Sequence, residues 1–136
     1  MNIPITVSAF IIIGGTNNGG RHDRVETFNP ETGESCIVGR LPEVRTAHTL
    51  CNNLLCGGNG IPSESTRRQC LLFDGLSSFT SLPVTLVKGR EMHMCWSLPS
   101  GDVMLIGGPR VKNTTEIVSK DGSSSTASFD LPYGVR

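Results

Sequence analysis

The residues of this sequence that could carry chemistry are two histidines and the arginines that precede them. His48 and His93 are separated by 45 positions, and each follows an arginine, Arg45 or Arg90, by three residues. Imidazole ligates zinc and copper and exchanges protons near neutral pH, so these are the residue types of a metal site or a general base. Because both histidines hold the same place in successive copies of one pattern, we expect each to hydrogen-bond between neighbouring units instead.

The five cysteines offer a second kind of chemistry. No two of them form a Cys-x-x-Cys pair, so the spacing usual for a zinc site is missing. They could be small buried residues of strands, or Cys56 and Cys70 could form a disulfide across a hairpin, which requires an oxidising compartment. The sequence leaves both alternatives open. The five are Cys36, Cys51, Cys56, Cys70 and Cys95.

The sequence contains no arrangement typical of an active site. The Gly-x-Ser-x-Gly motif of serine hydrolases is absent, and Asp102, Asp121 and Asp130 fall in predicted turns or strand ends rather than as a catalytic pair. The one tyrosine, Tyr133, lies in a predicted connection. We therefore expect no enzymatic activity, no cofactor and no metal.

Pairs of glycines follow three apolar runs and mark an internal repeat. The doublets are Gly14-Gly15, Gly57-Gly58 and Gly107-Gly108. A phosphate-binding loop would need a helix after the glycines, and we expect none after any doublet. We expect instead that each doublet ends a strand where a side chain would strike adjoining backbone and where positive φ is wanted.

Other residues keep the same period of about 45 residues. A second strand-like run follows each doublet, and a weaker run ending in Leu-Pro precedes an arginine. The recurring positions are Phe28, Phe73 and Val118 in the second run, then Arg45, Arg90 and Arg136 after the proline. Each period thus contains four short strands separated by turn residues, which is the unit of a β-propeller.

The doublets, the strand after each of them and the recurring Arg-x-x-His resemble kelch repeats, and the resemblance covers nearly the whole chain. It implies an all-β fold, a partial kelch-type β-propeller with about three blades of four antiparallel strands. The expected blades are residues 1–42, which are incomplete, residues 43–87, and residues 88–136, which include the start of a fourth. The sequence departs from the kelch pattern because no tyrosine follows the doublets. Cys36, Phe79 and Phe129 are matched to the fourth-strand tryptophan.

Three blades are fewer than the four to eight with which propellers usually close. An open stack leaves strand edges that pair with other chains. We therefore expect the chain to be a fragment of a larger propeller or to self-associate through open blade edges. Residues 3–6 could supply a poor first strand to the first blade, and Trp96 with Met94 is expected to pack in the core.

Strand directions predict a rim that gathers the loops after the doublets and the connections after the fourth strands. Arginines on this rim would suit carboxylates or acidic peptides, and this rim resembles the face with which kelch domains bind partner peptides. Alternatively, each repeated arginine pairs with a strand carboxylate such as Glu26 or Glu116 and fastens the blades together. The rim arginines in question are Arg45, Arg90, Arg136, Arg67 and Arg68.

Charge and hydropathy exclude two classes of partner. Lys and Arg total 12 and Asp and Glu total 12, so the net charge is zero and gives no reason to expect nucleic-acid binding. The longest apolar run, residues 9–13, is too short to cross a membrane. The compartment, cytoplasmic or secreted, stays open: no convincing signal peptide is present, while Asn113 begins a glycosylation sequon.

These observations favour a non-catalytic protein–protein interaction module of the kelch-repeat type, which recognises a protein through the rim loops. The alternative is a fragment of a larger secreted, galactose-oxidase-like propeller without independent activity. A structural scaffold is a third reading.

Overall fold

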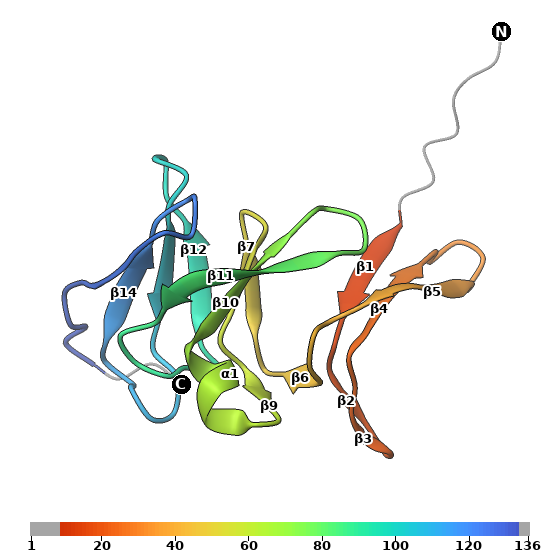
Figure 1. Ribbon diagram of the computed structural model, residues 1–136, viewed down its shortest axis with the longest axis horizontal. Helices are drawn as coiled ribbons and strands as arrows, with labels where there is room; N and C mark the ends of the chain where they lie inside the picture. Colours follow the sequence, from red (N-terminus) through yellow and green to blue (C-terminus); the bar gives the residue numbers. More distant parts are fainter. Residues whose placement is uncertain (1–8, 134–136) are drawn as a thin grey trace, which may run out of the picture.

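The computed structural model describes residues 9–133, and its strands form three main antiparallel sheets, none of which closes into a barrel. Figure 1 shows them side by side, with the first sheet at the right and the third at the left. Each sheet lies within one of the three predicted stretches of sequence. The chain is therefore all-β, as expected from its many glycines and prolines.

The first sheet has three strands in the order β1-β4-β5. They are β1 (Phe10–Ile13), β4 (Arg24–Phe28) and β5 (Ser35–Arg40). The short strands β2 (Thr16–Asn17) and β3 (Gly20–Arg21) form a hairpin between β1 and β4. The first strand that we assigned to residues 3–6 lies outside the described residues.

The second sheet has four strands in the order β11-β10-β8-β7. They are β7 (Thr49–Cys51), β8 (Leu54–Cys56), β10 (Gln69–Phe73) and β11 (Phe79–Thr85). The connection from β8 to β10 contains β9 (Asn59–Gly60), which pairs with β6 (Arg45–Thr46), and the helix α1 (Ser63–Arg68). Among residues 9–133, no helix is long and apolar enough to cross a membrane.

The third sheet repeats the order of the second. Its strands run β12-β13-β14-β15, each antiparallel to the next. They are β12 (Met94–Ser97), β13 (Val103–Ile106), β14 (Thr115–Val118) and β15 (Ser125–Ala127). The predicted sequence of four strands per period is therefore present in the second and third sheets.

Alternating side chains of the second sheet bury both of its faces. One face packs against the third sheet in a core of eight buried residues, and the other packs Leu55 and Leu71 against Leu41 and Ile13. The eight are Leu54, Cys56, Cys70, Val84, Leu86, Val103, Leu105 and Val118. The second sheet is thus the central layer of the molecule.

Two disulfides reinforce this arrangement. Cys56 and Cys70 face each other across β8 and β10 and are joined, so the hairpin disulfide that was one of our two alternatives is present. Cys51 of β7 and Cys95 of β12 form a second disulfide, between the second and third sheets, which the sequence analysis missed. The signal was available, because these cysteines lie 44 residues apart, close to one repeat period.

Three sequence predictions were wrong in detail. The helix α1 begins five residues after Gly58, where we expected no helix. The sequence gives no capping signal for it, because its N-cap residue is Pro62, which makes no side-chain capping bond. Trp96 is 64% exposed rather than packed in a core. The strand pairing places Ser125 of the third sheet, not Phe129, at the position of Phe79. Ser125 lies opposite Val118, as Phe79 lies opposite the equivalent residue Phe73.

The disulfide between the second and third sheets predicts a stability difference between cysteine variants. Replacing Cys51 and Cys95 by alanine should lower the free energy of unfolding by about 2–4 kcal/mol, because a loop of this length is no longer closed in the unfolded chain. Urea denaturation without reductant measures the change. Cys36→Ala is the control, since Cys36 is free and exposed, and it should change little. Equal stability of both variants would contradict the assigned bond.

Candidate functional site

The glycine doublets share one backbone conformation. The first glycine has φ of +60° at Gly14, +68° at Gly57 and +68° at Gly107, a region that residues with a Cβ rarely enter. A Cβ on Gly14 would stand 2.5 Å from the carbonyl oxygen of Arg45, and one on Gly57 would stand 2.5 Å from that of Arg90. Glycine is therefore required here by the neighbouring repeat as well as by the turn.

Each of these arginines binds the doublets on both sides of it. The Arg45 carbonyl accepts a hydrogen bond of 2.8 Å from the amide of Gly15, and the Arg45 guanidinium donates one of 2.8 Å to the carbonyl of Gly57. Arg90 does the same one repeat later, with Gly58 at 2.8 Å and Gly107 at 2.9 Å. We call this contact the arginine clasp. It connects each repeat to the next.

The buried guanidinium of Arg90 has a carboxylate partner. Its Nε donates to Glu116 Oε1 at 2.8 Å, and Glu116 Oε2 accepts hydrogen bonds from the Val87 amide and the Ser125 hydroxyl. A buried ion pair is tolerated only when its remaining hydrogen-bonding groups are satisfied, and these bonds meet that requirement. Arg90 and Glu116 therefore form a closed structural unit.

The guanidinium of Arg45 has weaker compensation. It donates to Glu43 Oε2 at 3.1 Å and to the side-chain amide oxygen of Gln69. Leu71 stands at the position in the second sheet that Glu116 occupies in the third, because Leu71 pairs with Leu55 as Glu116 pairs with Leu105. The two clasps thus share backbone contacts and differ in how the charge is balanced.

The predicted role of these arginines in partner binding is wrong. Arg45 and Arg90 are 0% and 1% exposed, so neither can contact a partner at the rim. The alternative holds for Arg90, which pairs with Glu116, whereas Glu26 pairs with Arg24 at 3.4 Å. Arg136 lies outside the described residues.

The other two predicted rim arginines, Arg67 and Arg68, differ in exposure. Arg67 is buried and pairs with Glu91 at 3.3 Å, and Glu64 of its own helix is further away at 3.8 Å. The prediction that Arg67 is an exposed contact for a partner is therefore also wrong. Arg68 is exposed, and its Nε donates to the Leu86 carbonyl at 3.0 Å. Of the four predicted rim arginines that lie in the described residues, Arg68 is therefore the one that is exposed and available for binding.

The histidines pack between sheets, as expected. His93 Nε2 lies 2.8 Å from the Thr49 hydroxyl oxygen, and its ring edge covers Gly57, while the ring of His48 covers Gly14 in the same way. Burial, with a smaller effect of the adjacent Arg90, lowers the pKa of His93 to about 4. Burial and Arg45 likewise lower the pKa of His48 to about 4. Both rings are thus neutral packing groups at pH 7.

Metal ligation finds no support in the part of the chain that the structure describes, where no three His, Cys, Asp or Glu side chains come together to hold an ion.

The sequon residue Asn113 is exposed in the loop between β13 and β14, but Thr115 of the same sequon is buried.

The loops after the doublets and the connections between sheets lie together along the lower edge of Figure 1, where β2, β3, β9 and α1 are seen. We call this edge the basic rim, because six exposed cations lie on it and several of its carboxylates are already paired with arginine. Among these carboxylates, Asp23 pairs with Arg40, and Glu91 pairs with Arg67 and Arg110. Glu64 of α1 is an exposed carboxylate on the same rim. The exposed cations are Arg21, Arg40, Arg68, Lys88, Arg110 and Lys112.

The opposite rim, formed by the hairpin turns within each sheet, is acidic. Two of its carboxylates stabilise their own turns: Asp74 accepts hydrogen bonds from three backbone amides, and Asp121 accepts hydrogen bonds from Ser123 and Ser119 that lower its pKa to about 2. Lys120 is the cation that these turns contain. The turn carboxylates are Glu31, Glu34, Asp74, Asp102 and Asp121. A chain of zero net charge therefore carries two rims of opposite sign.

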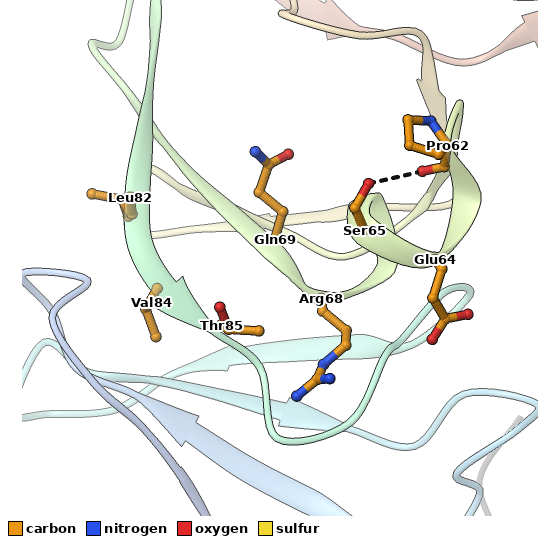
Figure 2. A pocket seen from close by; sticks show the side chains of 8 residues that line it. All are labelled: Pro62, Glu64, Ser65, Arg68, Gln69, Leu82, Val84 and Thr85. Carbon is orange, nitrogen blue, oxygen red and sulfur yellow. Dashed lines mark hydrogen bonds between the residues drawn. The ribbon is translucent and has the colours of Figure 1, made fainter.

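A hollow of about 610 Å³ opens at the basic rim between α1 and β11. Figure 2 shows the aliphatic side chains of Leu82 and Val84 on β11 across from α1, with the guanidinium of Arg68 below the helix. Most of the surface that lines this hollow is apolar, although the lining also includes one cation, Arg68, and one carboxylate, Glu64. The lining residues are Pro62, Glu64, Ser65, Arg68, Gln69, Leu82, Val84 and Thr85.

Comparison with known proteins assigns no family: no protein-family model matches the sequence, and no curated protein matches it.

The closed pair of Arg90 and Glu116 predicts a large loss on removing one partner. Arg90→Met should lower the free energy of unfolding by about 3–5 kcal/mol, because Glu116 is left buried without its cation. Arg40→Met is the control: Arg40 pairs with Asp23 at the surface, and its loss should be about 1 kcal/mol or less. Adding Glu116→Leu to Arg90→Met should recover part of the loss, since leucine fills the corresponding position 71. Chemical denaturation of the wild type and these three variants tests this.

The buried neutral histidines predict that stability falls with acid. The unfolded chain takes up a proton near pH 6.5, whereas folded His93 does so only near pH 4, so the free energy of unfolding falls between these values. From pH 7 to pH 5 the loss is about 2 kcal/mol for His93. His93→Gln, which cannot titrate, should remove about that much of the pH dependence in urea titrations at the two pH values. An unchanged slope would contradict the neutral buried ring.

Proposed function

We propose that this chain is a non-catalytic protein–protein interaction module of the kelch-repeat type, which binds an acidic segment of its partner at the basic rim. The observation that carries the proposal is the separation of charge. The six exposed cations lie at the rim where the loops after the doublets meet, although the chain as a whole is neutral. On the opposite rim the carboxylates of Asp74, Asp102 and Asp121 are bonded within their turns, so the basic rim is the surface that we propose binds the partner.

The propeller part of the proposal rests on the arginine clasp. The same set of backbone and guanidinium bonds recurs at Arg45 and Arg90, so consecutive sheets are joined in the same way, as repetition of one blade requires. In such an architecture the strands and clasps serve packing, and the loops are free to vary and to bind. The kelch type itself is inferred from the doublets and the Arg-x-x-His pattern.

The hollow beside α1 supports a peptide with acidic and apolar side chains as the ligand. Arg68 offers a charged, forked donor suited to a carboxylate, and Leu82 and Val84 offer an apolar wall next to it. A peptide that alternates acidic and apolar side chains would satisfy both. We infer that the partner segment contains a carboxylate residue flanked by an aliphatic one.

The two disulfides favour a second candidate, a domain of a larger secreted propeller of the galactose-oxidase-like class. Disulfides persist in oxidising compartments and are rare in the cytosol. Alkylation of the protein isolated from the cell that makes it distinguishes the compartments. One reactive thiol, that of Cys36, indicates secretion, and five indicate the cytosol.

Binding to the basic rim can be tested with a fluorescent peptide of alternating Glu and Leu. Fluorescence anisotropy should show binding that weakens with salt, and Arg68→Glu with Arg110→Glu should reduce the affinity about tenfold or more through charge repulsion. The matched control compares two single variants, Arg68→Glu and Lys120→Glu, which make the same change of charge, because Lys120 lies in a turn of the opposite rim. If these two single variants lose affinity equally, recognition does not occur at the basic rim.

A further inference from the structure

The first and third sheets each have one face that no other described sheet covers. Figure 1 shows these two sheets at opposite ends of the row, with the second sheet between them. On the third sheet the uncovered face carries Trp96, 64% exposed, opposite Met104 in the neighbouring strand. We call it the Trp96 face. Its apolar side chains are Met94, Trp96, Met104, Ile106 and Ile117, which alternate with the buried Val103 and Leu105.

The uncovered face of the first sheet is also apolar. Phe10, 59% exposed, lies opposite Phe28, and Ile12 lies opposite Glu26, which in turn lies opposite Ile37. These side chains alternate with Ile13 and Val25, which point to the second sheet. We call this surface the Phe10 face, with the members Phe10, Ile12, Glu26, Phe28 and Ile37.

The internal repeat shows what such faces bind. Ile12 holds the position of Leu55 in the second sheet and Leu105 in the third, two residues before the first glycine of each doublet. Leu55 packs toward the first sheet and Leu105 packs toward the second. The Phe10 face is therefore the copy of a surface that, twice within this chain, packs on the preceding sheet.

The Trp96 face is the counterpart. Met104 and Ile106 hold the positions of Leu54 and Cys56, which face the third sheet in the main core. Within the chain this surface always packs on the following sheet. The two uncovered faces thus belong to opposite sides of the same kind of interface, and each is the surface that the other is built to meet.

We propose that two copies of this chain associate head to tail, with the Trp96 face of each packed on the Phe10 face of the other, to close a ring of six sheets. Two copies related by a twofold axis close such a ring, because each copy contributes one Trp96 face and one Phe10 face to two equivalent contacts, and six sheets fall within the range of four to eight with which propellers close. Two such contacts remove both exposed apolar faces at once. This association involves surfaces other than the basic rim, so it does not depend on what that rim binds.

Light scattering coupled to size-exclusion chromatography tests the proposal on the full chain. The expected mass is twice 14.6 kDa. Trp96→Glu and Ile12→Glu should each give a monomer, because each places a charge in both contacts of the ring. The control Leu76→Glu, at a 72% exposed position in the turn between β10 and β11, should leave the dimer intact. If Trp96→Glu fails to fold by circular dichroism, Met94→Glu on the same face replaces it.

Mixing the two monomeric variants separates a head-to-tail contact from any other. In a mixed pair, one interface carries both substitutions while the other is fully native, so the mixture should recover dimer that neither variant forms alone. A wild-type monomer, an open polymer, or a mixture that stays monomeric would overturn the proposal.

Discussion

The arginine clasp is the interaction on which the rest of this structure depends. A guanidinium carries five donors, and burying it is costly unless carbonyl or carboxylate oxygens surround it. The carbonyls of Gly57 and Gly107 are available because a doublet with positive φ turns them away from the strand ladder. The glycines in turn are needed because the backbone of the next arginine lies against them. Arginine and doublet are therefore interdependent, and neither can change alone.

The clasps act at one end of the sheets, and the two interfaces differ in what supports them elsewhere. The second and third sheets share the larger core, the bond between Cys51 and Cys95, and the balanced pair of Arg90 with Glu116. The first sheet is held by the Arg45 clasp, a smaller apolar contact around Leu55 and the packing of His48 on Gly14. Local stability follows the number of buried contacts, so the first sheet is the part that opens at lowest cost.

Much of the fold could be read from the sequence, because a repeat reports the same contact several times. The doublets, the four strands of each complete period, the hairpin disulfide among the open alternatives and the packing of His48 and His93 all followed from spacing. The spacing of residues in the sequence does not show, however, whether their side chains are buried or exposed. Arg45 and Arg90 recur because they are buried, and the same recurrence would suit a ring of surface charges. Trp96 and α1 escaped for a related reason: each occurs in one repeat, so no second copy indicated its environment.

A repeat architecture also separates the surfaces on which different functions can evolve. Strand faces must match the next sheet, so their apolar pattern is set by packing and leaves the end faces complementary to each other. Loops at the rims carry no such constraint, and there the charges have segregated, with carboxylates such as that of Asp74 bonded in the turns of one rim and exposed cations gathered at the other. Because net charge sums over both rims, its value of zero says nothing about either. Recognition of an acidic segment is compatible with a neutral chain for that reason.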